Sequence, residues 1–148
     1  EQAVYWFRVS ADSGVAEGSV VSGTYDPLMP GPTDTVLNVT VSCDRDGGPG
    51  TITLTMGLSA GTYGSSESAR QMYKAVPPND FLSYGLFRDS GRSSVWGSST
   101  GINTVSQSLA VPNKGSASSV FTIFGRIPAL QNVSPGDYSD YLQATVSP

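Results

Sequence analysis

The sequence of 148 residues has no histidine and a single cysteine, Cys43, and both shortages narrow the possible functions. Histidine is the usual general base near neutral pH and the commonest ligand of transition metals, so its absence argues against an enzyme or a metal protein. One cysteine cannot form a disulfide within the chain. A lone thiol in a strand is most often a small buried apolar residue, and the alternative is pairing with another chain.

Charged residues are also scarce, at 14% of the chain against about 25% in ordinary globular proteins. The net charge is −4, and the eight basic residues are scattered, whereas nucleic-acid-binding proteins cluster Lys and Arg against phosphates. No apolar run approaches the roughly 18–20 residues of a membrane span. We therefore expect no nucleic acid, no membrane insertion and no cofactor. The abrupt start at Glu1-Gln2 would fit a mature, exported chain or a trimmed one.

What the sequence has in abundance is short segments in which apolar and polar residues alternate. The clearest are Thr35–Cys43 and Thr51–Leu58, and the Gly- and Asp-rich loop between them is typical of a β-hairpin. A weak helical pattern occurs only at Ser65–Tyr73. Further strands are expected at Val20–Tyr25, Phe81–Arg88, Ser94–Trp96, Thr104–Val111, Val120–Ile127 and Tyr138–Val146. Many short strands separated by turns predict one all-β domain, a sandwich or a barrel.

Both ends of the chain carry apolar alternation of their own. At the N-terminus the alternating residues are Ala3, Tyr5, Phe7 and Val9. At the C-terminus they are Tyr138, Leu142, Ala144 and Val146. Chain ends are poorly ordered unless something holds them, so the apolar N-terminal segment must dock, either in its own domain or in a neighbouring copy. The residues alone leave both possibilities open.

Five segments in register resemble a known family. Tyr84–Gly97 (YGLFRDSGRSSVWG) is similar to the YNLYxDxxRxxxWG segment of the spore coat protein U domain family. Phe121–Pro128 resembles its VYGRIP strand, and Pro135–Val146 resembles its terminal PGxYxDxxxVTV strand. Upstream, Gly23–Pro27 matches the FGxYDP element and Val39–Cys43 matches VxVxC.

The resemblance implies a pilin, the structural subunit of an archaic chaperone–usher surface fibre that serves adhesion and biofilm formation. Its fold would be an immunoglobulin-like β-sandwich that lacks its last strand and is completed by donor-strand exchange. The implied partners are neighbouring pilin subunits, a periplasmic chaperone and an outer-membrane usher, and the implied location is an extracellular fibre reached through the periplasm. The family usually has an earlier cysteine that bridges to the position of Cys43, but Ser10–Ser19 contains none.

This interpretation assigns residues 1–12 to a donor strand and 13–148 to the pilin domain. The residues expected to enter the neighbour's groove are Ala3, Tyr5, Phe7 and Val9. Inserting the opposite face, Val4, Trp6 and Arg8, would bury the unpaired charge of Arg8, which is costly. The acceptor groove is expected to be lined by Tyr138, Leu142, Ala144 and Val146.

Other chemistry is weaker. Asp44 and Asp46 lack the spacing of a calcium loop and fit a solvated turn. Asp137 and Asp140 would face opposite sides of a strand, unlike a glycosidase pair. No catalytic or metal site is predicted.

Three aromatic residues in the family segment allow two interpretations. They could form a sugar-binding platform, but core packing is favoured; they are Tyr84, Phe87 and Trp96. The alternative functions are therefore a non-fibrous spore- or cell-coat protein and a carbohydrate-binding adhesive tip module.

Overall fold

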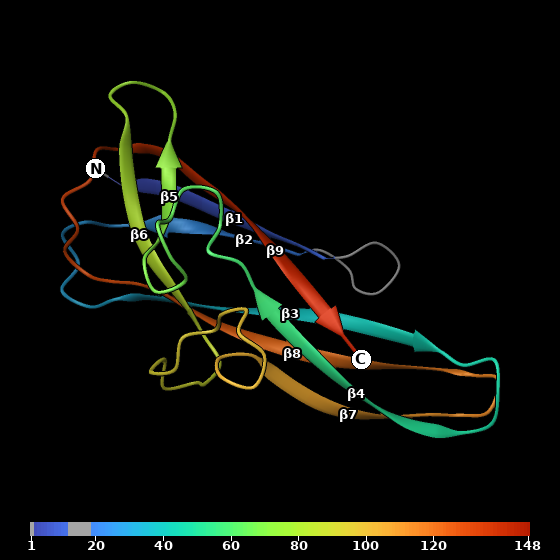
Figure 1. The fold of residues 1–148 in the computed structure, drawn as a ribbon. Helices are drawn as coiled ribbons and strands as arrows, with labels where there is room; N and C mark the ends of the chain where they lie inside the picture. Colours follow the sequence, from blue (N-terminus) through green and yellow to red (C-terminus); the bar gives the residue numbers. More distant parts are fainter. Residues whose placement is uncertain (1, 12–18) are drawn as a thin grey trace.

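The computed structural model describes residues 2–11 and 19–148, which form nine β-strands and no helix (Figure 1). The strands are β1 (Ala3–Ala11), β2 (Ser19–Tyr25), β3 (Thr33–Asp44), β4 (Gly50–Leu58), β5 (Arg70–Lys74), β6 (Asp80–Phe87), β7 (Val105–Val111), β8 (Ser116–Ile127) and β9 (Gly136–Ser147). The structure confirms the predicted fold class, an all-β sandwich of the immunoglobulin-like kind.

The strands form two sheets that share β6. One runs β2-β1-β9-β5-β6, and the C-terminal part of β9 pairs instead with β4, which pairs with β7. The other contains β3 and β8 in a twelve-residue antiparallel register, and β8 also pairs with the end of β6. Side chains bridge the remaining seams: Ser19 Oγ donates to Asn38 O (3.2 Å) between β2 and β3, and Gln107 Nε2 donates to Val120 O (2.9 Å) between β7 and β8.

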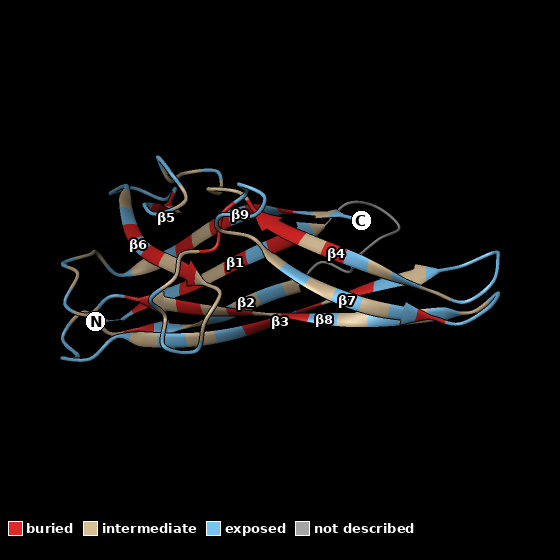
Figure 2. Ribbon diagram, turned by 60° about the horizontal axis from the view of Figure 1, so that its bottom comes forward, coloured by how far each residue is buried: buried red, intermediate tan, exposed pale blue. Residues whose placement is uncertain are grey.

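The core lies between the two sheets because each strand turns every second side chain inward. Figure 2 shows this as buried bands that alternate with exposed ones along the strands. In β3 the inward residues are Leu37, Val39 and Val41, and in β4 they are Leu54, Met56 and Leu58. Alternation with a period of two therefore located the core positions of these strands correctly.

The predicted hairpin between β3 and β4 is wrong. β3 pairs with β8, and β4 pairs with β7 and β9, so the intervening loop crosses from one sheet to the other. It is held by the loop between β7 and β8, where Lys114 N donates to Gly47 O (3.0 Å) and Arg45 N donates to Gly115 O (2.9 Å). Turn chemistry reverses the chain in both arrangements and does not decide whether the flanking strands pair.

Two further local predictions also fail. The helical pattern at Ser65–Tyr73 is a turn followed by β5, whose inward residues are Arg70, Met72 and Lys74. Because two of these three are cationic, apolar alternation could not reveal the strand. Ser94–Trp96 is no strand either, since it contributes only an isolated bridge between Phe87 and Val95.

Candidate assembly site at the terminal strands

The N-terminal strand β1 lies between β2 and the last strand, β9 (Figure 1). It pairs antiparallel with β2 and parallel with β9, in a register from Ala3 opposite Gly136 to Ala11 opposite Ala144. Each edge of β1 is therefore paired within its own chain. The predicted domain boundary between residues 12 and 13 lies outside the described residues.

The inward face of β1 is the one that alternation singled out, and its residues are Ala3, Tyr5, Phe7 and Val9. None is more than 4% exposed, and the Phe7 ring stacks on Tyr84 at a centroid distance of 5.1 Å. On the opposite face Val4 is 44% exposed and Arg8 is exposed. These four inward residues lie in the core of their own chain. Their entry into a neighbouring copy stays a prediction.

The residues predicted to line the groove all point into the core from β9. Tyr138, Leu142 and Ala144 are buried, and Val146 is half-buried against the same cluster. Tyr138 lies opposite Tyr5 and Leu142 opposite Val9 in the register. The place beside them is thus filled by β1, and their role as an acceptor for another copy stays a prediction.

A carboxyl group that the prediction left out sits in the middle of this inward row. Asp140 lies opposite Phe7 and is fully buried. Its Oδ2 accepts a hydrogen bond from Tyr84 Oη at 2.5 Å, and its Oδ1 accepts from Thr62 N at 2.9 Å. Burial raises the pKa of Asp140, and these bonds oppose the rise. The signal was available, because Asp140 shares the alternation phase of Tyr138 and Leu142.

A buried guanidinium lies close to this carboxyl group. Arg70 on β5 is fully buried, and its guanidinium donates hydrogen bonds to backbone carbonyls. Nε and Nη2 donate to Ser59 O, Nη1 donates to Glu67 O, and Nη2 also donates to Trp96 O. Burial lowers the pKa of Arg70, and Tyr84, Glu67 and Asp140 partly offset that. The guanidinium thus ties two loops to β5, and its donors are used in holding the fold.

A glycine allows the large side chain of Tyr5 to lie over β2. Gly23 is opposite Tyr5 in the β1–β2 register. A Cβ atom at Gly23 would stand 2.6 Å from Tyr5 Oη and 2.9 Å from its Cζ, closer than such atoms approach in proteins. The glycine of the Gly23–Pro27 motif is therefore explained by the packing of the N-terminal strand.

Comparison with known proteins identifies the family of the chain. The family model of the Spore Coat Protein U domain matches residues 8–145. The chain belongs to the Spore Coat Protein U domain family. It is also similar to Protein U of Myxococcus xanthus, with 28% identity over 151 residues that cover 93% of this chain and 76% of that protein. The family consists of structural proteins of the coat or pilin type, which indicates a surface or coat protein.

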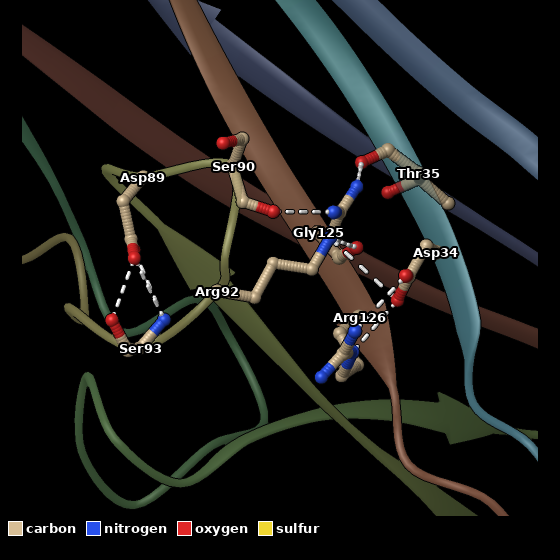
Figure 3. A network of polar contacts seen from close by, with 8 residues as sticks. All are labelled: Asp34, Thr35, Asp89, Ser90, Arg92, Ser93, Gly125 and Arg126. Carbon is tan, nitrogen blue, oxygen red and sulfur yellow. Dashed lines mark hydrogen bonds and ion pairs between the residues drawn. The ribbon is translucent and has the colours of Figure 1, made fainter.

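The characteristic residues of the Spore Coat Protein U segment at 84–97 hold loops and sheets together (Figure 3). Asp89 Oδ2 accepts from Ser93 Oγ at 2.6 Å and closes the turn after β6. Arg92 reaches from this turn to both strands of the other sheet, donating to Gly125 O (2.9 Å) and Thr35 O (3.0 Å). Arg92 has a φ of 57°, a left-handed conformation that these bonds help to maintain.

An ion pair extends the same network across β3 and β8. Arg126 binds Asp34 through two hydrogen bonds, of 2.7 and 3.0 Å, and Arg92 lies 3.6 Å from the same carboxylate. The guanidinium of Arg92 also covers the Phe124 ring at 5.6 Å. Arg92 of segment 84–97 and Arg126 of segment 121–128 therefore connect the loop after β6 with strands β3 and β8.

The aromatic residues of the Spore Coat Protein U motifs are mostly buried. Trp96 is 1% exposed and donates from Nε1 to Met56 O at 2.9 Å. Tyr25 is equally buried and donates to Pro128 O at 2.7 Å. Tyr84 is 4% exposed, and only Phe87 is half-buried. The sugar platform considered for Tyr84, Phe87 and Trp96 is therefore wrong, because two of its three members lie in the core.

Cys43 on β3 has a free thiol and is half-buried. It lines a hollow of about 270 Å³ together with residues of β4 and the chain end, among them Ile52, Leu54, Val146 and Pro148. The segment in which the family carries a second cysteine falls mostly on residues 12–18, outside the described part of the chain.

The carboxylates of the weaker predictions lie apart. Asp137 is exposed and Asp140 is buried, so the two face opposite sides of β9 as predicted. Over residues 2–11 and 19–148, no group of three or more potential metal-ligating side chains comes together. The same residues contain no helix of the length and hydropathy that a membrane crossing requires.

Proposed function

We propose that this chain is the pilin of a chaperone–usher surface fibre and that it polymerises by donor-strand exchange. Membership of a structural coat and pilin family supports the class. The finer proposal rests on β1, a strand at one end of the chain whose four inward residues complete the core beside β9.

A strand β1 from a second copy can make the same contacts beside β9 as the chain's own β1. If β1 leaves its place, the inward residues of β9 lose their neighbours and an apolar groove opens, which is an association hazard. An identical strand from a second copy restores the same backbone hydrogen bonds and the same side-chain packing. Removing β1 breaks its pairing with β2 and with β9, and a strand from a second copy would restore both. Fibre and closed monomer are then alternative arrangements of one strand.

The proposed route to the fibre follows from this hazard. A periplasmic chaperone would cover the groove beside β9 until an outer-membrane usher replaces it with β1 of the next subunit. The fibre would be extracellular and would serve adhesion and biofilm formation. An open groove cannot persist in water, because both an unpaired strand edge and apolar side chains would be exposed.

The experiment uses two variants that should each stop the growth of a fibre, one because it lacks the donor strand and one because its groove is damaged. A variant lacking residues 1–11 has a groove and no donor, while Leu142→Asp has a donor and a damaged groove. Exported with the wild type as a minor component, either variant should shorten the fibres seen by negative-stain microscopy, and neither should form fibres alone. Fibres of normal length made by the deletion variant alone would contradict the proposal.

The same measurement addresses the second candidate, a non-fibrous coat protein. The similarity to Protein U and the internal pairing of β1 favour it. Wild-type protein that remains monomeric after export, with no fibres in any preparation, would support this candidate and exclude the pilin.

A further inference from the structure

The outer face of the sheet β2-β1-β9-β5-β6 carries a band of aromatic residues that the fold does not need for its core. The strands lie side by side in Figure 1, and the band consists of Trp6, Tyr63, Tyr73, Phe81 and Tyr141. Phe81 and Tyr141 are each 45% exposed, and the other three are half-buried.

Strand register aligns the band into a row across the sheet. Trp6 is opposite Ser22 on one side and Ser139 on the other, Ser139 is opposite Tyr73, and Tyr73 is opposite Phe81. The row therefore crosses all five strands at one level. Neighbouring strands lie about 4.8 Å apart, so roughly 10 Å separates the backbone of Trp6 from that of Tyr73.

The rings form two groups with a small residue between them. On one side Trp6 meets Tyr141 edge to face, with centroids 5.2 Å apart. On the other side Tyr73 packs against Tyr63 at 4.9 Å and against Phe81 at 5.0 Å. Ser139 on β9 lies between the groups, so the face has an aromatic shoulder on either side of a short hydroxyl side chain.

The chemistry around the rings is almost uncharged. Along the five strands, the outward positions carry two charges, Arg8 and Asp137, which are of opposite sign. The other outward positions carry hydroxyl and amide side chains, among them Ser22, Gln71, Ser83 and Gln143, and two exposed valines, Val4 and Val20. An exposed apolar patch with a polar rim is typical of a binding surface. Rings beside hydroxyls and amides, without net charge, match a neutral ligand that has both apolar faces and polar edges.

We propose that this face binds a neutral polysaccharide. The C–H face of a sugar ring is apolar and stacks on an aromatic ring, while its hydroxyls lie at the edge and bond to serine and glutamine. A polyanion finds no cationic surplus here to replace its counterions. Because Trp6 belongs to β1, the face is complete whenever β1 lies beside β9, whether it comes from the same chain or a neighbour. The proposal therefore does not depend on fibre formation.

The test is native electrophoresis of the purified protein in gels that contain one polymer each. The neutral probes are hydroxyethylcellulose, dextran and yeast mannan, and the anionic comparator is polygalacturonate. We expect retardation by at least one neutral polymer and none by polygalacturonate. Trp6→Ala and Tyr73→Ala should each weaken the apparent affinity about tenfold. Val120→Ala is the control, since Val120 is 49% exposed on β8 in the other sheet and should bind as the wild type does.

Ser139→Arg is a second variant that leaves every ring in place. A long charged side chain between the two aromatic groups should abolish retardation while the melting temperature shows that the protein is folded. Four results would overturn the proposal: no retardation by any neutral polymer, unchanged affinity in all three face variants, equal retardation by polygalacturonate, or a wild-type dimer that Trp6→Ala converts to monomers. The last would assign the face to a second copy of the chain. None of these outcomes depends on whether fibres form.

Discussion

At the scale of single residues, the hydrogen bonds of buried polar groups near the terminal strands explain two family motif positions, Tyr84 and Asp140. Asp140 accepts from Tyr84, and Arg70 donates to main-chain carbonyls. Burial also raises the pKa of Tyr84 well above its usual value, and the charge of Asp140 adds to that effect. Buried polar groups are tolerated when they are hydrogen-bonded, and these are.

Substitutions at Leu142 test which side of β9 faces the core. It is 3% exposed and lies opposite Val9. Leu142→Ala should lower the free energy of unfolding by about 2–5 kcal/mol, through lost burial and the cavity left behind. Leu142→Asp should cost more, because it forces a charge into an apolar site. Urea unfolding measures both.

The matched control for that change is Gln143→Asp, which places the same charge one residue along on the exposed face of β9. It should leave the urea midpoint close to that of the wild type. Equal destabilisation by the two aspartates would show that the assigned facing of the strand is mistaken.

The lowered pKa of Asp89 predicts how the stability of the protein changes in acid. Hydrogen bonds from the Ser93 side chain and from the Ser94 backbone lower the pKa of Asp89 from 3.8 to about 2. A carboxyl group whose pKa is lower in the folded state stabilises the protein above the unfolded value, and this stabilisation is lost as the pH falls from about 4 towards 2. Asp89→Asn should therefore be less stable than the wild type at pH 7, and the difference should shrink by pH 2. Thermal unfolding across this range checks it, and a difference that does not change with pH would contradict the assignment.

At the scale of elements, the direction of β1 is the most informative feature. It runs parallel to β9, although a strand added directly after the chain end would run antiparallel to it. Twelve residues of β9 extend about 40 Å at the usual rise of 3.3 Å per residue. To let a strand attached after Pro148 pair parallel to β9, the linker must therefore reach back over most of this length.

This geometry predicts the outcome of a graft. In a variant lacking residues 1–11, a copy of the segment attached after Pro148 through twenty Gly and Ser residues should restore cooperative thermal unfolding near the wild-type temperature. A four-residue linker permits only antiparallel entry and should restore much less. Equal rescue by the two linkers would show that the groove accepts the strand in either direction.

At the scale of the whole molecule, β1 fills the place between β2 and β9, and two seams between the sheets are bridged by side chains. β2 and β3 meet through Ser19, and β7 and β8 meet through Gln107. Strand β6 belongs to both sheets, and the loop after it adds a further connection, in which Arg92 donates to Thr35 O and Gly125 O. The sandwich thus depends on contacts between residues far apart in the sequence.

The amino-acid pattern alone predicts where most strands lie and which side of each is buried, because alternation is a local property of neighbouring residues. In the N-terminal segment it picked out Ala3, Tyr5, Phe7 and Val9, which are the buried residues of β1, while their entry into a neighbouring copy stays a prediction. It also showed the family, because the motif residues have local roles in turns such as that of Asp89. It could not reveal β5, whose inward Arg70 and Lys74 imitate surface residues.

The neighbours of each strand become visible only in the folded chain. β3 pairs with β8 and not with β4, β1 pairs with its own β9, and Asp140 meets Tyr84 across 56 residues. The aromatic row on the outer face likewise exists only after four separate registers are combined. Which strands pair depends on how whole faces fit together between residues far apart in the sequence. Alternation with a period of two is the same for every possible partner. The pattern within a strand therefore does not indicate which strand lies beside it.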